Sequence, residues 1–213
     1  MGVRSNNINL LKEKYITSYC TIAAGTINKN GAQTYAHDGD IATFLLAAYQ
    51  HLQLNYPKFY KMDNLSKLGW LAAEVLLKDS FKKDDYQPED VSVILANANS
   101  SLDDDIRYLE SIKDVASPSL FVYTLPNIVI GEICIRNHFK GEQAFYIHDD
   151  FDADFIAQQV NYQLDNNIAQ ACICGWVDVL GEDYKAVLFL VEKKRNENSL
   201  EFSAGTMREI FNR

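Results

Sequence analysis

Ser117–Gly141 reads SPSLFVYTLPNIVIGEICIRNHFKG, and the sequence continues with EQAFYIHDDFDADF up to Phe155. Apolar residues at helical spacing give way to a short aromatic and β-branched run, which is then followed by acids and a second helical pattern. The pattern predicts, in order, a loop around 117–118, a helix over 126–137, a strand over 142–148 and a helix over 152–164. A strand between two helices indicates a sheet covered by helices.

The rest of the chain shows the same two kinds of pattern. It predicts strands over 15–24, 91–96, 171–179 and 186–192, helices over 41–54 and 63–78, and a further helix starting near Ser100 or Ser101. Turn residues at Asn28–Gly31 and Gly181–Asp183 predict two hairpins. Asp38 or Asp40 is placed to cap the helix that follows it. The order predicts one α/β domain over residues 1–213, with a mixed β-sheet and helices on both faces.

Composition excludes several classes of function. The chain has 213 residues and a formal net charge of −9, which disfavours binding to nucleic acid because that binding relies on many cations. No apolar run reaches the roughly 18 residues that a membrane span needs. The first residues, MGVRSNNINLLKEK, lack the apolar core of a secretory signal. We therefore expect a cytoplasmic protein that does not bind membranes.

Four cysteines in such a chain are expected to be reduced thiols. Cys172 and Cys174 are two residues apart in an apolar run, so on a strand they would point to the same face. A metal site would need a second cysteine pair or a nearby histidine, and the sequence has neither. We interpret both cysteines as small core residues and expect no metal and no cofactor.

Acidic residues gather in two places. Asp103–Asp105 would lie in the first turn of a helix, where carboxylates complement the exposed amides, and we prefer this reading to a metal site. The second cluster is HDDFDAD, from His148 to Asp154. It does not match a calcium loop counted from Asp150, because Phe155 stands where that loop requires glycine and Asn161 where it requires glutamate. An acid-capped junction between strand and helix is favoured, and a paired-carboxylate acid–base site remains an alternative.

Three blocks of sequence resemble the N-terminal domain of the β-ketoacyl-acyl-carrier-protein synthases, which belong to the thiolase-like superfamily. The blocks are PKFYKMDNLSKLGWLAAEVLL from Pro57 to Leu77, VSVILANANSSLDDDIRYLESI from Val91 to Ile112, and the succession Ser117, Pro118, Phe121, Asn127, Gly131, Lys140 and Gly141. The resemblance as a whole extends over roughly residues 15–192. The resemblance implies the N-terminal half of a thiolase-like fold. A chain of this length is too short to contain the second half of that fold as well.

The family's chemistry needs a cysteine thiolate at the start of a helix, where the helix dipole lowers the thiol pKa. Counting forward from Gly141, the resemblance places that nucleophile at about Asp150, within one residue. No cysteine occurs between Cys134 and Cys172. Since the histidines of the second half would also be missing, condensation by this chain alone is not expected. His148, Asp149 and Asp150 are the only weak catalytic candidates.

The resemblance also implies partners and contact residues. Relatives pair across a dimer axis through the strand that would be Gln143–Ile147 here, with Phe145 packing at the seam and Gln143 and Ile147 beside it. Phe121, Val122 and Ile128 are candidates for lining an acyl tunnel. We expect either a homodimer or a heterodimer with a ketosynthase.

An acyl carrier protein is a further candidate partner, although it is acidic like this chain. It would need a local basic spot such as Lys58 and Lys61, and an ordinary solvated surface is the simpler reading of those two lysines.

The favoured function is that of a non-catalytic, chain-length-factor-like subunit in fatty-acid, polyketide or polyene synthesis. Two alternatives belong to other classes. One is a small acyl-thioester hydrolase or transferase that uses the acidic cluster from His148 to Asp154. The other is a homodimeric binding module with no acyl ligand.

Overall fold

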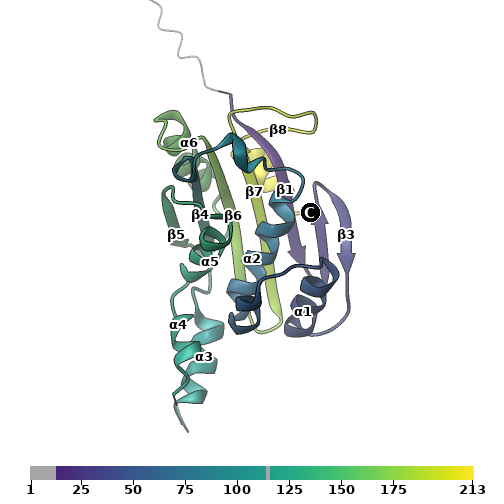
Figure 1. Cartoon of the computed structure of the whole chain (residues 1–213), viewed down its shortest axis with the longest axis vertical. Helices are drawn as coiled ribbons and strands as arrows, with labels where there is room; N and C mark the ends of the chain where they lie inside the picture. Colours follow the sequence, from purple (N-terminus) through teal and green to yellow (C-terminus); the bar gives the residue numbers. More distant parts are fainter. Residues whose placement is uncertain (1–12, 114–115) are drawn as a thin grey trace, which may run out of the picture.

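A computed structural model describes residues 13–113 and 116–213 (Figure 1). The N-terminal stretch on which the expectation of a cytoplasmic location rests is outside these residues. The strands are β1 Tyr15–Ala23, β2 Thr26–Lys29, β3 Ala32–Ala36, β4 Val91–Asn97, β5 Gln143–Ile147, β6 Ala171–Leu180, β7 Asp183–Glu192 and β8 Leu200–Glu201.

The strands form one sheet in the order β3-β2-β1-β7-β6-β4-β5, with β8 pairing with β1. β4 runs parallel to both of its neighbours, β5 and β6, whereas the other pairs are antiparallel. The predicted mixed sheet is therefore confirmed. β5 is an edge strand, because within the described residues it pairs only with β4.

Helices cover both faces of this sheet, as predicted. The α-helices are α1 Ile41–His51, α2 Asn64–Leu77, α3 Leu102–Ser111, α4 Pro118–Val122, α5 Ile128–Asn137, α6 Ala153–Asp165 and α7 Ala204–Phe211, and the short 3₁₀ helices are η1 Pro57–Lys61, η2 Lys83–Asp85 and η3 Pro88–Asp90. α1, α2 and α5 contribute to one hydrophobic core, and α6 and α7 to a second one on the opposite face. α3 and α4 extend away from the body of the sheet (Figure 1). No helix within the described ranges is long and apolar enough to cross a bilayer.

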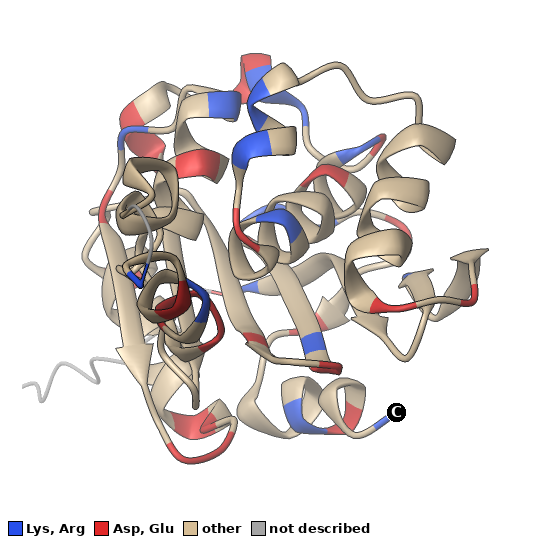
Figure 2. Cartoon of the chain, turned by 90° about the horizontal axis from the view of Figure 1, so that it is seen from below, with Lys and Arg blue, Asp and Glu red and all other residues tan. Residues whose placement is uncertain are grey.

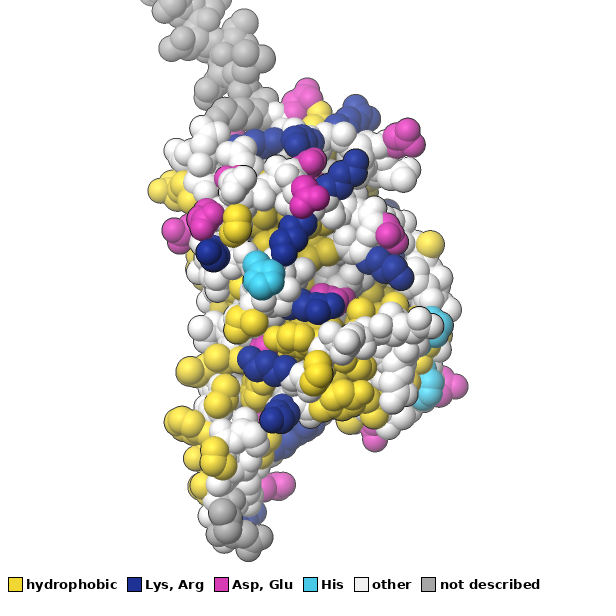
Figure 3. All heavy atoms as spheres, in the orientation of Figure 1, with side chains coloured by type: hydrophobic (Ala, Val, Ile, Leu, Met, Phe, Trp, Pro, Cys, Tyr) yellow, Lys and Arg dark blue, Asp and Glu magenta, His cyan; other side chains and the backbone are white. Residues whose placement is uncertain are grey.

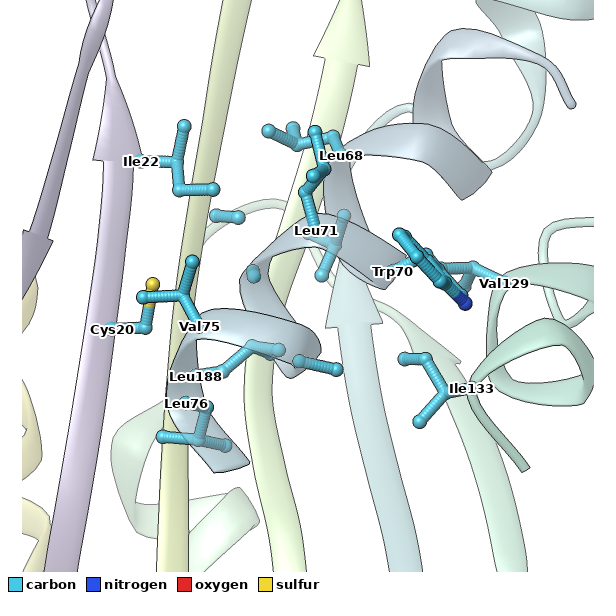
Figure 4. Packing of buried hydrophobic residues seen from close by; sticks show 14 of the residues in the cluster. Cys20, Ile22, Leu68, Trp70, Leu71, Val75, Leu76, Val129, Ile133 and Leu188 are labelled. Atoms are coloured by element: carbon cyan, nitrogen blue, oxygen red, sulfur yellow. The ribbon is translucent and has the colours of Figure 1, made fainter. Parts of the chain in front are cut away.

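The larger core is built around α2 (Figure 4). Its N-cap is Asp63, whose carboxylate accepts hydrogen bonds from the amides of Leu65 and Ser66 at 3.2 and 3.0 Å. α2 approaches α5 closely at Gly69, where an added Cβ would come within 2.4 Å of Val129 Cγ2. The absence of a Cβ at Gly69 thus permits the short distance between α2 and α5.

The strand β4 contributes to both cores, because alternate side chains point to opposite faces. Val93 and Leu95 belong to the larger core, whereas Ile94 belongs to the second. Cys172 and Cys174 on β6 share the second core and have no exposed surface. The interpretation of these two cysteines as core residues is confirmed.

Some predicted boundaries need correction. The turn at Asn28–Gly31 does not close the first hairpin, because β1 already turns at Ala24 and Gly25, both with positive φ. The predicted turn instead joins β2 to β3, with Asn30 and Gly31 at φ of 52° and 83°. Asp40 rather than Asp38 caps α1.

Candidate functional site

The acidic junction from His148 to Asp154 connects β5 to α6. The amide of His148 donates a 3.0 Å hydrogen bond to the carbonyl of Asn97, which extends the pairing of β5 with β4 by one residue. Asp152 caps α6 by accepting a 2.9 Å hydrogen bond from the amide of Phe155. Asp154 pairs with Arg208 of α7 at 2.6 Å. The acid-capped junction that the sequence favoured is what the chain forms.

The three weak catalytic candidates lie side by side in sequence but are not assembled into a site. Asp149 and Asp150 are exposed. The imidazole of His148 is half-buried against Phe155, with ring centroids 4.6 Å apart. Within the described part of the chain, no hydrogen bond joins His148 to either acid. The position expected for a nucleophile is therefore held by a solvated carboxylate at Asp150.

All four cysteines are buried and free. Burial raises the pKa of Cys20 to about 12 and that of Cys134 to about 12 as well. Burial also raises the pKa of Cys174, with its neighbour Cys172 adding to the effect. At neutral pH these thiols are protonated and inaccessible, so none is positioned to act as a nucleophile. Among the described residues, no group of three or more His, Cys, Asp or Glu side chains could hold a metal ion.

The three dimer-interface candidates lie on the edge strand β5. Gln143 is exposed, and Ile147 is 51% exposed. Phe145 is half-buried and packs against the larger core, so Ile147 is the more available apolar side chain of the strand. All three line a cavity of about 380 Å³ together with Pro126, Asn127 and Ile130. This cavity connects the edge strand to the start of α5.

A second exposed apolar region extends from this edge. We call residues 102–113 and 116–125, which include α3 and α4, the arm. Of the fifteen large hydrophobic side chains exposed in the described residues, nine lie between positions 102 and 147, and Figure 3 shows hydrophobic side chains gathered along the arm. On α3, Leu102, Ile106 and Leu109 are exposed at the spacing of one helical face.

The tunnel candidates are not brought together. Phe121 is 61% exposed and lines a cavity of about 260 Å³ with Tyr108 and Pro118. Val122 is also exposed and does not line that cavity, and Ile128 packs against the larger core. An acyl tunnel formed by all three within one chain is not present among the described cavities.

Partly buried polar contacts fix the root of the arm. Asp178 on β6 accepts hydrogen bonds from the amides of Ala98 and Asn99 at 3.2 and 3.0 Å. Ser101 Oγ donates a 2.9 Å hydrogen bond to the carbonyl of Thr124, which ties the start of α3 to the end of α4. Ser101 does not cap α3 with its side chain. The arm is therefore attached by tertiary contacts that the sequence did not indicate.

Asp103–Asp105 lie in the first turn of α3, as predicted, but their burial was not predicted. Asp103 and Asp104 are buried rather than lying as solvated charges on the first turn of α3. Asp103 accepts a 2.9 Å hydrogen bond from the amide of Gly181, in the turn between β6 and β7, and pairs with Arg107 at 3.2 Å. Asp103 and Asp104 are shielded from solvent because α3 contacts both α2 and β6.

The basic spot at Lys58 and Lys61 lies on η1. Both lysines are exposed, and Lys58 pairs with the buried carboxylate of Glu132 on α5 at 2.6 Å. Figure 2 shows basic and acidic residues interspersed over the elements. Two lysines, one of them already paired, form a small positive area.

Comparison with known proteins gives structural matches only. No family model matches the chain, and no curated protein does. Solved structures with the same fold include the ishigamide ketosynthase/chain length factor, which is 15% identical with a TM-score of 0.60, covering 84% of this chain and 62% of that chain. A second is the ketosynthase ApeO in complex with its chain length factor ApeC from Xenorhabdus doucetiae, at 14% identity and a TM-score of 0.55, covering 86% and 80%.

A third match is the type II polyketide synthase complex AntDE:AntF, in which an acyl-carrier protein is bound to its ketosynthase. It is 15% identical with a TM-score of 0.57, covering 84% of this chain and 62% of that chain. The chain thus spans less than two thirds of the ishigamide and AntDE:AntF chains. These matches confirm the resemblance at the level of fold, which is the thiolase-like fold of ketosynthase and chain-length-factor chains.

Proposed function

We propose that this chain is a non-catalytic, chain-length-factor-like subunit that assembles with a ketosynthase in fatty-acid, polyketide or polyene synthesis. The observation that carries the proposal is the open edge of β5, flanked by exposed apolar side chains, on a fold shared with ketosynthase and chain-length-factor chains. An unpaired strand edge beside an apolar surface is a template for pairing with another chain.

The geometry of β5 suits pairing with a second sheet of the same kind. When two related sheets meet across a two-fold or near-two-fold axis, their edge strands run antiparallel. Phe145 is the middle residue of the five in β5 and would lie nearest such an axis. Ile147 is at the end of the strand next to the acidic junction, so it would face the partner close to the position of the missing nucleophile.

The arm would enlarge this contact. Leu125, which is 58% exposed, precedes the Pro126 that lines the cavity beside β5. Exposed apolar side chains are thus available both beside β5, at Ile147, and on the arm, at Leu125, Phe121 and Val122. Burial of such side chains stabilises a complex by roughly 25 cal/mol per Å² of apolar area, before the entropic cost of association. In a heterodimer, Phe121 and Val122 would line an acyl tunnel that the two chains complete together.

The chemistry of the chain supports a role without catalysis. Every cysteine is buried with no exposed thiolate, and Asp150 holds the expected nucleophile position. A carboxylate cannot form the thioester on which condensation depends. The catalytic thiol would therefore come from the partner.

Co-expression with a ketosynthase encoded beside this chain tests the proposal. We expect a stable complex with one copy of each chain on size-exclusion chromatography, and condensing activity only when both are present. Two separate peaks at micromolar concentrations would contradict the heterodimer. A stable dimer of this chain alone, with no affinity for the ketosynthase, would favour the homodimeric binding module instead.

Docking of an acyl carrier protein would require a positive surface on the complex. Lys58 and Lys61 are both exposed, and Lys58 is already paired with Glu132, so the carrier would need more positive surface than the two lysines provide. If η1 forms part of the docking surface, Lys61→Glu should weaken carrier binding to the complex without affecting its assembly. An unchanged affinity would assign carrier docking to the ketosynthase alone.

A further inference from the structure

Asp104 is a buried carboxyl with no hydrogen-bonding partner. Its side chain is 1% exposed, and both of its oxygens are inaccessible to solvent without accepting a hydrogen bond in the described part of the chain. A carboxylate in such a place would have lost its hydration without compensation, which is costly. A neutral carboxylic acid avoids most of that cost.

A second buried carboxyl acts on Asp104. Asp63, the N-cap of α2, is 6% exposed, and its charge adds to the effect of burial in disfavouring the ionised form of Asp104. The two groups are not equivalent, because Asp63 accepts two backbone hydrogen bonds that favour its own carboxylate, whereas Asp104 accepts none. Burial raises the pKa of Asp63 as well, but its hydrogen bonds oppose that rise, whereas within the described residues no hydrogen bond opposes it at Asp104.

Other charges around the pair do not reverse this conclusion. α3 contributes Asp103 and Asp105, which repel a charge on Asp104, and Arg107, which attracts it; α2 contributes Lys67, whose charge acts on Asp63. Tyr123, after α4, faces Asp63. Burial and Asp63 prevail over Arg107, and together they raise the pKa of Asp104 from 3.8 to about 7.

The position of Asp104 connects its protonation to the attachment of the arm. Asp104 is in the first turn of α3, at the root of the arm and opposite the start of α2. We propose that docking of the arm on the body of the protein is linked to a proton, with Asp104 neutral in the docked arm and ionised in the released arm. Release exposes Asp104 to water and separates it from Asp63. The inference does not depend on the proposed function, since it concerns the isolated chain.

The direction of the pH dependence follows from the pKa of Asp104 in the docked and in the released arm. In the released arm Asp104 titrates near its usual value of 3.8, whereas the docked arm retains the proton up to about pH 7. Between these values each pH unit favours release by up to about tenfold, because one proton is lost on release. Above about pH 7 both states are ionised and the dependence ends.

Hydrogen exchange of the isolated chain between pH 5.5 and 8 tests the proposed linkage. This pH range lies above the isoelectric point of the chain, which is near 4.9. After correction for intrinsic exchange rates, protection of the α3 amides should fall up to about tenfold per unit until about pH 7 and then level off. Protection of the α2 amides at Leu68–Val75 serves as the internal reference.

Three variants make the test decisive. Asp104→Asn should abolish the pH dependence of α3, whereas Glu110→Gln, which removes an exposed charge from the same helix, should retain it. Asp63→Asn keeps an N-cap residue but removes the charge beside Asp104. The pH at which protection of the α3 amides levels off should therefore be lower in this variant. Constant protection of α3 in the native chain, or an unchanged dependence in Asp104→Asn, would overturn the proposal. Should Asp104→Asn not fold, the absence of a shift in Asp63→Asn would overturn it equally.

Discussion

Asp103 Oδ1 accepts a 2.9 Å hydrogen bond from the backbone amide of Gly181, and this bond joins the first turn of α3 to the turn between β6 and β7. The two residues are far apart in sequence, yet the bond anchors the arm to the most regular hairpin of the sheet. The arm is thus fastened at a defined point.

Replacement of Asp103 by alanine should destabilise the chain by about 1–2 kcal/mol, because it removes a hydrogen bond to a charged acceptor. Urea denaturation would measure the change. Arg107→Ala is the control, since it removes the ion pair of Asp103 with a partly exposed arginine but leaves the bond to Gly181 in place, and it should cost about 0.5 kcal/mol or less. Equal losses in the two variants would show that the bond to Gly181 contributes nothing.

Ile147→Lys should weaken assembly with a ketosynthase at least about tenfold, because a lysine would be buried without a partner at the seam. Titration by analytical ultracentrifugation would measure the affinity. Leu46→Lys is the control, since Leu46 is also an exposed aliphatic side chain, and its helix α1 lies at the other end of the sheet from β5 (Figure 1). If both variants bind like the native chain, β5 is not in the interface.

Gly69→Ala and Gly131→Ala should have opposite effects although both glycines are helical. A Cβ at Gly69 would meet Val129 Cγ2 at 2.4 Å, so the variant should lose about 1–3 kcal/mol through overpacking. A Cβ at Gly131 meets nothing within 4 Å, and the gain in helix propensity should stabilise the chain by up to about 1 kcal/mol. Thermal unfolding followed by circular dichroism compares them, and a stabilised Gly69→Ala would contradict the close approach of α2 and α5.

The four thiols should not react with a disulfide reagent in the native chain, because all are buried and the pKa values of Cys20 and Cys134 are raised to about 12. All four should react after denaturation. Absorbance of the released thiolate counts them in both states. Rapid reaction of one thiol in the native chain would reopen the question of a cysteine nucleophile.

Acyl-carrier and coenzyme A thioesters should not be turned over by the chain alone, and Asp150→Ala should behave identically, because Asp150 is a solvated carboxylate without a hydrogen-bonded base. Release of free thiol measures turnover. Hydrolysis that Asp150→Ala abolishes would instead support the acyl-thioester hydrolase.

The central part of the fold could be predicted because its patterns are local. Apolar runs identified β4, β6 and β7, and helical spacing of apolar residues identified α2. The proline and acids around the opening segment located α5, β5 and α6. β3 and α7 were not predicted, since β3 is an exposed strand without an apolar pattern and α7 has only Met207 and Ile210 buried.

The site was predicted less well, for a physical reason. Asp103 and Asp104 follow the general preference of acids for the first turn of a helix, and only the contact of α3 with α2 and β6 buries them. Likewise, the sequence indicates that Phe121 and Val122 are apolar but not that they are exposed on an extended arm. Tertiary contacts between distant segments decide both features.

The open edge of β5 bears on how a cell would handle this chain. Unpaired strand edges and exposed apolar side chains are what chaperones and proteases recognise in incompletely assembled proteins. A copy without a partner would be treated as an orphan subunit and removed. If the chain assembles as proposed, its abundance should therefore follow the supply of the partner rather than its own rate of synthesis.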